Sequence, residues 1–134
     1  QTKNAEKIFE FLENNKNVEE VFYPGSKKFN QFNLAKKQML GNGTILSFKL
    51  KQKKKETIKK TTFKFMNKLN MIDISNNLGD TKSLITHPFT TTHCRLTNTE
   101  KKQLHISENL VRLSVGLENV DDIIADIEES LELK

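Results

Sequence analysis

The stretch LVRLSVGLENVDDIIADIEESL, residues 110–131, decides the fold that we expect for this chain. Its first part alternates apolar and polar positions, with Val111, Leu113 and Val115 on one side, which is typical of a strand with one buried face. After Gly116, apolar residues recur at three- and four-residue spacings, which predicts a helix that packs on the sheet. The stripe of this helix consists of Val120, Ile123, Ile124, Ile127, Glu128 and Leu131.

The rest of the chain mixes helix and strand patterns. Helical periodicity predicts further helices over residues 2–15, 32–39 and 56–69. Thr2 can cap the first, and Thr97 with Glu100 fits a capping box that opens another short helix. Extended, turn-bounded runs predict strands at residues 18–23, 44–51, 71–74 and 83–85. The order α-β-α-β-α-β-β-α-β-α predicts an α+β domain, an antiparallel or mixed sheet with helices on one face.

The composition indicates one globular domain. The chain has 134 residues, 35% hydrophobic and 29% charged, and no apolar run approaches the roughly 20 residues that a membrane span needs. Cys94 is the single cysteine, which excludes an internal disulfide and fits a reducing compartment, so we expect a cytoplasmic protein. The first residues carry neither Met nor a signal pattern, so we expect a chain excised or processed at its front.

The net charge of +5 raises the possibility of a nucleic-acid partner. Seven of the lysines lie within residues 49–60, and seven acidic residues lie within 117–134, so the charges are segregated. The chain has two arginines, and the lysine run has no aromatic residue before Phe63. Bidentate phosphate contacts and base stacking need those residue types, so we expect a solvated lysine run and no nucleic-acid partner.

Side chains that could carry chemistry are few. His87, His93 and Cys94 lack a recognised metal-ligand spacing, and His93 and Cys94, as neighbours in an extended segment, point to opposite faces. We therefore expect structural roles for them and no metal site. The same analysis predicts a buried core for the aromatic residues Phe9, Phe22, Phe48, Phe63 and Phe65.

Arg112 is the most informative polar residue, because it interrupts an apolar strand pattern. A guanidinium can hold a carboxylate through two parallel hydrogen bonds. Strand alternation alone allows a simpler interpretation, in which Arg112 lies on the solvent side while Val111 and Leu113 face the core.

Four stretches together are similar to the pyridoxal-phosphate enzymes of sulfur amino acid metabolism, which include cystathionine synthases and lyases, methionine lyase and homoserine sulfhydrylases. The stretches are NAEKIFEFLENNKNVEEVFYPG (4–25), LAKKQMLGNGTILSFKL (34–50), ISNNLGDTKSLITHPFTTTHCRL (74–96) and residues 110–131. The form NNLGDTKSLITHP most resembles the O-succinylhomoserine or O-acetylhomoserine sulfhydrylase branch.

The resemblance implies that residues 1–134 are the small C-terminal domain of a type I pyridoxal-phosphate enzyme, whose large cofactor-binding domain is absent. By the same resemblance, Arg112 binds the α-carboxylate of the amino acid substrate. Asn77 stands at the family's second carboxylate contact, often a serine, and its amide can still donate a hydrogen bond. Thr92 and His93 match a family TTH segment, for which we expect a supporting role in the wall of the site.

The family's Schiff-base lysine, phosphate cup and ring-stacking aromatic belong to the large domain. The resemblance therefore implies pyridoxal phosphate in the parent enzyme, a homo-oligomer, and neither cofactor nor activity in this chain alone. Two alternatives stay open: a stand-alone binding or structural module, and a split-gene remnant whose partner is encoded separately. The chain departs from the family at Ser26, at Phe29-Asn30, and at His105, where a glycine is usual.

Overall fold

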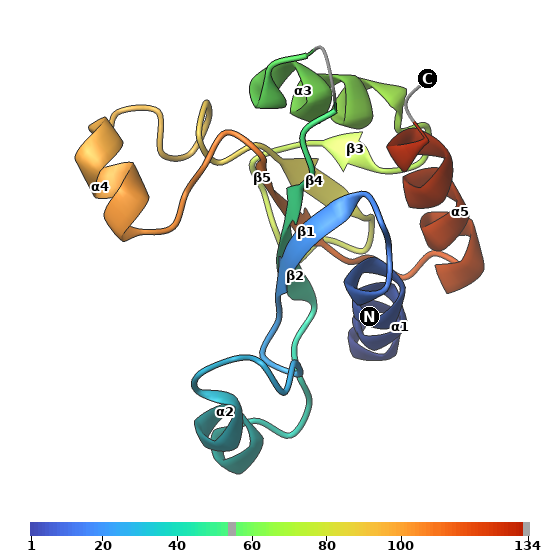
Figure 1. Ribbon diagram of the computed structural model, residues 1–134. Coiled ribbons are helices and arrows are strands. Elements are labelled where there is room, and N and C mark those ends of the chain that lie inside the picture. Colours follow the sequence, from blue (N-terminus) through green and yellow to red (C-terminus); the bar gives the residue numbers. More distant parts are fainter. Residues whose placement is uncertain (54–55, 133–134) are drawn as a thin grey trace.

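The computed structural model describes residues 1–53 and 56–132, and its elements follow in the predicted order (Figure 1). The helices are α1 (Thr2–Glu13), α2 (Phe32–Gln38), α3 (Ile58–Lys68), α4 (Asn98–Gln103) and α5 (Val120–Leu131). The strands are β1 (Val18–Phe22), β2 (Ile45–Leu50), β3 (Asp73–Ile74), β4 (Leu84–Thr86) and β5 (Leu110–Ser114). The predicted solvated lysine run includes residues 54–55, which lie outside the described residues.

The strands form one mixed sheet in the order β1-β2-β5-β4-β3. The pairs β1–β2, β2–β5 and β4–β5 are antiparallel, whereas β3 and β4 are parallel. The apolar strand β5 lies in the centre, which agrees with its burial on the helical face. The predicted mixed sheet is therefore confirmed.

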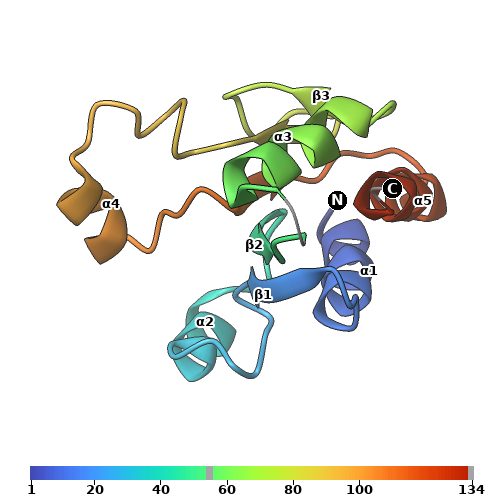
Figure 2. The ribbon, with the colours of Figure 1, turned by 45° about the horizontal axis from the view of Figure 1, so that its top comes forward.

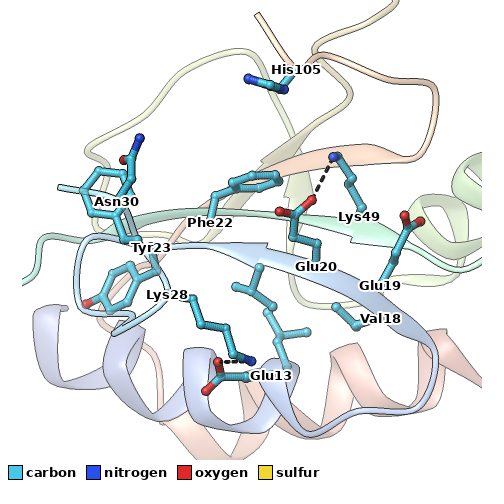
Figure 3. A pocket seen from close by; sticks show the side chains of 13 residues that line it. Glu13, Val18, Glu19, Glu20, Phe22, Tyr23, Lys28, Asn30, Lys49 and His105 are labelled. Carbon is cyan, nitrogen blue, oxygen red and sulfur yellow. Dashed lines mark hydrogen bonds and ion pairs between the residues drawn. The ribbon is translucent and has the colours of Figure 1, made fainter. Parts of the chain in front are cut away.

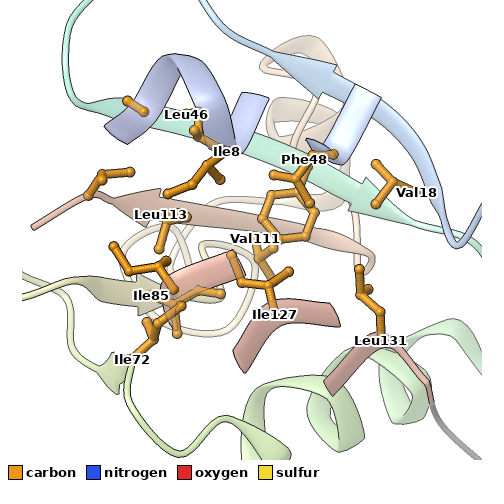
Figure 4. Packing of buried hydrophobic residues seen from close by; sticks show 14 of the residues in the cluster. Ile8, Val18, Leu46, Phe48, Ile72, Ile85, Val111, Leu113, Ile127 and Leu131 are labelled. Atoms are coloured by element: carbon orange, nitrogen blue, oxygen red, sulfur yellow. The ribbon is translucent and has the colours of Figure 1, made fainter. Parts of the chain in front are cut away.

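One face of the sheet is covered by α1, α3 and α5, as the prediction of helices on one face requires (Figure 1). Every second residue of β2 and β5 points into this layer, including Leu46, Phe48, Val111 and Leu113 (Figure 4). These side chains meet apolar residues of the helices such as Ile127. Helices α2 and α4 stand apart from this layer (Figure 2), and no residue of α2 is buried.

The aromatic residues divide between the core and the surface. Phe48 and Phe65 are fully buried and meet edge to face with ring centroids 5.9 Å apart, as predicted. Phe9 packs against the core cluster but stays partly exposed. The prediction is wrong for Phe22 and Phe63, which are half-buried outside the cluster, because each lies beside polar groups.

Two helix predictions need correction. Thr2 is not a cap, because it is the first helical residue of α1 and Gln1 precedes it without a side-chain hydrogen bond. In α5, Glu128 is exposed although it follows the apolar period. By contrast, the capping box is confirmed, with both hydrogen bonds between Thr97 and Glu100 present.

Asp126 takes the buried acidic position of α5, which the apolar pattern did not indicate. Its carboxylate accepts hydrogen bonds from the backbone N–H groups of three of the four residues that connect α3 to β3. The donors, at 2.8–3.1 Å, are Asn70, Met71 and Ile72. This side chain therefore joins α5 to the connection that leads into β3 at the edge of the sheet, and it provides a partner for the backbone N–H of the buried Ile72.

The turn between β5 and α5 approaches the start of β4 closely. A Cβ atom at Gly116 would lie 2.5 Å from the backbone nitrogen of Ser83, so only glycine fits there. The carboxylate of Glu118 accepts hydrogen bonds from both the backbone N–H and the hydroxyl of Ser83. None of the described helices is both long enough and apolar enough to span a membrane.

Candidate functional site

The face of the sheet opposite α1, α3 and α5 carries the candidate site; we call it the open face. Four neighbouring strands each place one residue in a lateral row across it. The register pairs these residues in the order Phe22, Ser47, Arg112 and Thr86. Arg112 lies inside this row because it alternates with the buried Val111 and Leu113.

Arg112 is partly exposed, and its Nη2 donates a hydrogen bond of 2.9 Å to the backbone carbonyl of Asn76. Among the described residues, the guanidinium makes this one hydrogen bond, and no carboxylate of the described residues forms an ion pair with it. A guanidinium carries five N–H donors, so Arg112 keeps donors for a ligand. The solvent-side placement of Arg112 is confirmed, and that placement leaves it accessible.

Asn77 lies in the loop of residues 75–80, which follows β3 and was predicted as a loop. The side chain of Asn77 is exposed, and its backbone N–H donates to Ser75 Oγ at 3.3 Å. The same loop is tied to β5 where the N–H of Gly79, with φ +78°, donates to Ser114 Oγ at 2.9 Å. Because Arg112 bonds to Asn76, the fold brings the loop of Asn77 beside the guanidinium.

Thr86 and Thr91 are further residues at this site, and the sequence patterns did not single them out. The Thr86 hydroxyl donates to Asn76 Oδ1 at 2.8 Å and lies 3.0 Å from Thr91 Oγ1. Thr91 in turn donates to the carbonyl of His87. The sequence does contain a signal for Thr86, because it is the polar residue that ends the otherwise apolar run 84–86.

His87 is buried and structural, as expected. Its Nε2 lies 3.0 Å from the carbonyl of Glu108, which can only accept, so Nε2 carries the proton. Its Nδ1 lies 2.8 Å from Thr90 Oγ1, and the Phe63 ring meets the imidazole edge to face. Burial, aided by the charge of Lys59, lowers the pKa of His87, although the hydrogen bond to Glu108 opposes the shift.

The predicted wall residues Thr92 and His93 lie in a turn after His87, where Thr92 Oγ1 is 2.7 Å from His93 Nδ1. Cys94 follows in the same turn and is exposed. Neither Thr92 nor His93 makes a hydrogen bond to Arg112 or Asn77 within the described part of the chain. Across residues 1–53 and 56–132, no three His, Cys, Asp or Glu side chains gather as a metal site would require.

A separate groove of about 490 Å³ runs along β1, the edge strand of the sheet (Figure 3). Neither Arg112 nor Asn77 lines it. Its lysines are already paired, Lys28 with Glu13 at 3.0 Å and Lys49 with Glu20 at 2.8 Å. The groove therefore offers little cationic character for an anionic ligand.

The described residues do not fit pyridoxal phosphate, the cofactor that the resemblance implies. That cofactor needs a lysine amine beside donors for its phosphate. In the groove of β1, the Glu19 carboxylate, which accepts a hydrogen bond from Asn109 Nδ2 at 3.0 Å, adds negative charge where a phosphate would need donors. The buried lysine of the described residues, Lys101, instead places its Nζ over the Phe89 ring, 4.2 Å from the centroid.

Comparisons with known proteins show which family this chain resembles in sequence and in structure. Residues 1–132 match the family described as Cys/Met metabolism PLP-dependent enzyme. The chain is 44% identical over 127 residues to the O-succinylhomoserine sulfhydrylase of Mycobacterium tuberculosis, a match that covers 95% of this chain and 31% of the relative. It is 45% identical over 132 residues to an L-methionine gamma-lyase of Fusobacterium nucleatum subsp. polymorphum, covering 97% and 32%.

Among solved structures, the fold is similar to a putative O-acetylhomoserine (thiol)-lyase of Campylobacter jejuni, with a TM-score of 0.90 and 35% identity. That similarity covers 98% of this chain and 30% of the other. The chain thus spans about a third of the length of the relatives that it matches. Nearly its whole length matches one family in both sequence and structure, so the chain belongs to the Cys/Met metabolism PLP-dependent enzymes.

Proposed function

We propose that this chain is the C-terminal domain of a Cys/Met metabolism PLP-dependent enzyme and that it supplies the site for the substrate's α-carboxylate. The observation that carries the proposal is the position of Arg112 at the centre of the open face, with one donor on the Asn76 carbonyl. A planar guanidinium binds a carboxylate through two parallel N–H donors. The Asn77 amide, on the same loop, would supply a further donor.

The parent enzyme, in this proposal, is a sulfhydrylase or lyase that acts on an amino acid such as an acylated homoserine. For a sulfhydrylase the reaction is γ-replacement, in which the acyl group leaves and a sulfur nucleophile adds. The names of the relatives, a sulfhydrylase, a lyase and a thiol-lyase, support this class. Arg112 would hold the substrate at its carboxylate and leave the reacting side chain free.

Pyridoxal phosphate and the lysine that holds it belong, we propose, to a large domain that completes the enzyme. The coverage supports this, since the chain spans about a third of its relatives, and so does the poor fit of the described residues to the cofactor. Helix α2 agrees, because its region exposes Leu34, Met39 and Leu40. Exposed apolar side chains that cluster are typical of an interaction surface.

We extend the proposal to a homo-oligomeric, cytoplasmic parent enzyme.

The carboxylate site is tested by an NMR titration of the chain with O-acetyl-L-homoserine. We expect shifts at the Arg112 guanidinium and the Asn77 amide, and none with the α-carboxamide analogue, because that analogue lacks the negative charge. Arg112→Gln should abolish the response, whereas Arg95→Gln, which changes the other arginine at an exposed turn, should preserve it. A response that survives Arg112→Gln would exclude the proposed site.

The placement of the cofactor is tested separately. The purified chain is incubated with pyridoxal phosphate, reduced with borohydride and mapped by mass spectrometry. We expect labelling that is absent or scattered over exposed lysines. Stoichiometric labelling of a single lysine would show that this chain holds the cofactor itself. The coding region upstream distinguishes the alternatives, since an open frame with a Schiff-base lysine supports one continuous enzyme and a stop codon supports a split gene.

A further inference from the structure

We propose that Thr86 is a positioning residue that keeps the Asn76–Asn77 segment in place when Arg112 turns its donors to a carboxylate. This inference rests on the proposed function and deepens it, because it names what maintains the geometry of the site. Two observations support it: the hydrogen bonds to the backbone carbonyl and to the side-chain oxygen of Asn76, and the strand register that pairs Thr86 with Arg112.

Asn76 is held from two sides by adjacent members of the open-face row. Its backbone carbonyl accepts from Arg112 Nη2 at 2.9 Å, and its side-chain Oδ1 accepts from the Thr86 hydroxyl at 2.8 Å. Arg112 and Thr86 are directly paired across β5 and β4. Asn76 itself is exposed, so it contributes little to the core, and these two bonds are the ones that its own carbonyl and side chain make among the described residues.

The bond from Arg112 is the one that a ligand would disturb. A bidentate carboxylate occupies two guanidinium N–H groups and therefore competes with the Asn76 carbonyl for donors. Without a second tether, the loop would be released at the moment when the Asn77 amide is needed. The Thr86 hydroxyl provides that tether, and it is fixed because the Thr86 side chain is only 1% exposed.

Thr86 also reaches the second loop that the resemblance places in the site. Its hydroxyl lies 3.0 Å from Thr91 Oγ1, and Thr91 donates to the His87 carbonyl at 2.8 Å. Thr91 immediately precedes Thr92-His93. Because Thr86 donates its one proton to Asn76 and Thr91 donates its own to His87, the two hydroxyl oxygens are in contact without a proton between them, and Thr86 lies between the loop beside Arg112 and the turn that carries the TTH segment.

The other tethers of residues 75–80 lie at the two ends of the loop. The N–H of Ser75 donates to the Ile85 carbonyl at 3.0 Å, and the N–H of Gly79 donates to Ser114 Oγ at 2.9 Å. Between them, Asn76, Asn77 and Leu78 are all exposed. The Asn77 N–H donates within the loop, to Ser75 Oγ at 3.3 Å, so among the described residues Thr86 is the partner outside the loop that holds its middle without Arg112.

The test repeats the titration with O-acetyl-L-homoserine on Thr86→Val and Thr86→Ser and adds amide hydrogen exchange. One neutral hydrogen bond contributes about 0.5–1.5 kcal/mol, so Thr86→Val should weaken binding about two- to tenfold. The variant should also speed exchange at Asn77 and Gly79. Thr86→Ser keeps the hydroxyl and should restore both. The matched control is Thr61→Val, another buried threonine, whose hydroxyl donates to the Thr57 carbonyl far from this loop.

Asn76→Ala removes the same hydrogen bond from an exposed residue, so it tests the tether if Thr86→Val does not fold. We expect Asn76→Ala to reproduce the weaker binding and the faster exchange. A wild-type chain that does not bind the amino acid would refute the proposed function, while the exchange rates would still test the tether. Wild-type binding that neither substitution weakens, with unchanged exchange, would overturn the role of Thr86.

Discussion

The two faces of the sheet differ in what covers them, although the same strands supply both. On the helical face, Phe48, Val111 and Leu113 have no exposed surface and pack against α1, α3 and α5. On the open face, Ser47 and Arg112 take the intervening positions of β2 and β5 and stay partly exposed. Stability and recognition are therefore encoded by alternate residues of one strand, so neighbouring substitutions should have separable effects.

The largest expected effect is on the free energy of unfolding, and it separates substitutions at two neighbouring residues of β5. Leu113→Ala removes a fully buried side chain and should lower the free energy of unfolding by about 2–5 kcal/mol. Arg112→Ala removes a partly exposed side chain that donates one hydrogen bond to the Asn76 carbonyl, and we expect a loss of no more than about 1 kcal/mol. Urea unfolding of both variants measures the difference. Equal losses would show that Arg112 supports the fold and would contradict the division between the faces.

A second comparison concerns two glycines of the connections between elements, Gly116 in the turn after β5 and Gly79 in the loop between β3 and β4. Gly116→Ala would place a Cβ atom 2.5 Å from the Ser83 nitrogen and the Thr81 carbonyl oxygen, so backbone must move. Overpacking of this kind typically costs about 1–3 kcal/mol. Gly79→Ala has free space but a φ of +78°, for which we expect about 1–2 kcal/mol. Thermal unfolding of the two variants checks this, and a neutral Gly116→Ala would mean that the β5–α5 turn adapts easily.

The third prediction concerns how stability depends on pH through His87, which directly follows β4. Burial lowers the pKa of His87 below its value of 6.5 in the unfolded chain. The unfolded state therefore binds the proton more readily, and stability falls as the pH drops below about 6.5. The loss is at most about 1.4 kcal/mol per pH unit until the folded-state pKa is passed.

The measurement is urea unfolding of wild type and His87→Gln between pH 7 and pH 5. The glutamine variant should lose the part of the pH dependence that His87 contributes. The control is His93→Gln, which changes a histidine of the neighbouring turn. An unchanged pH profile in His87→Gln would show that this imidazole is not buried as the structure describes.

The helical face could be predicted from the sequence, whereas the open face could be predicted only in part. Alternation in β2 and β5 and the period of α5 sufficed for the core, because burial imposes a repeat that one sequence displays. Asp126 was missed, since its three partners come from a distant connection. Thr86 was missed for the same reason: its importance depends on the strand register, which places it beside Arg112.

The position of Arg112 followed from alternation, but its role rests on resemblance, because no local pattern specifies a ligand. The resemblance also drew attention to His105, a departure from the family that the structure explains. His105 has a φ of +58° and is the non-glycine residue with positive φ in the described part of the chain. It follows the end of α4, where its N–H donates to the Lys102 carbonyl and the N–H of Ile106 donates to the Lys101 carbonyl.

These two hydrogen bonds form a Schellman motif, whose left-handed residue is usually glycine because a Cβ atom is unfavourable there. His105→Gly should therefore raise the free energy of unfolding by up to about 1 kcal/mol. His105→Ala is the matched control, since it removes the imidazole but keeps the Cβ atom and should give no such gain. If alanine stabilises as much as glycine, the imidazole and not the backbone is unfavourable. If glycine destabilises, the exposed imidazole above the groove of β1 makes a contact that outweighs the strained backbone (Figure 3).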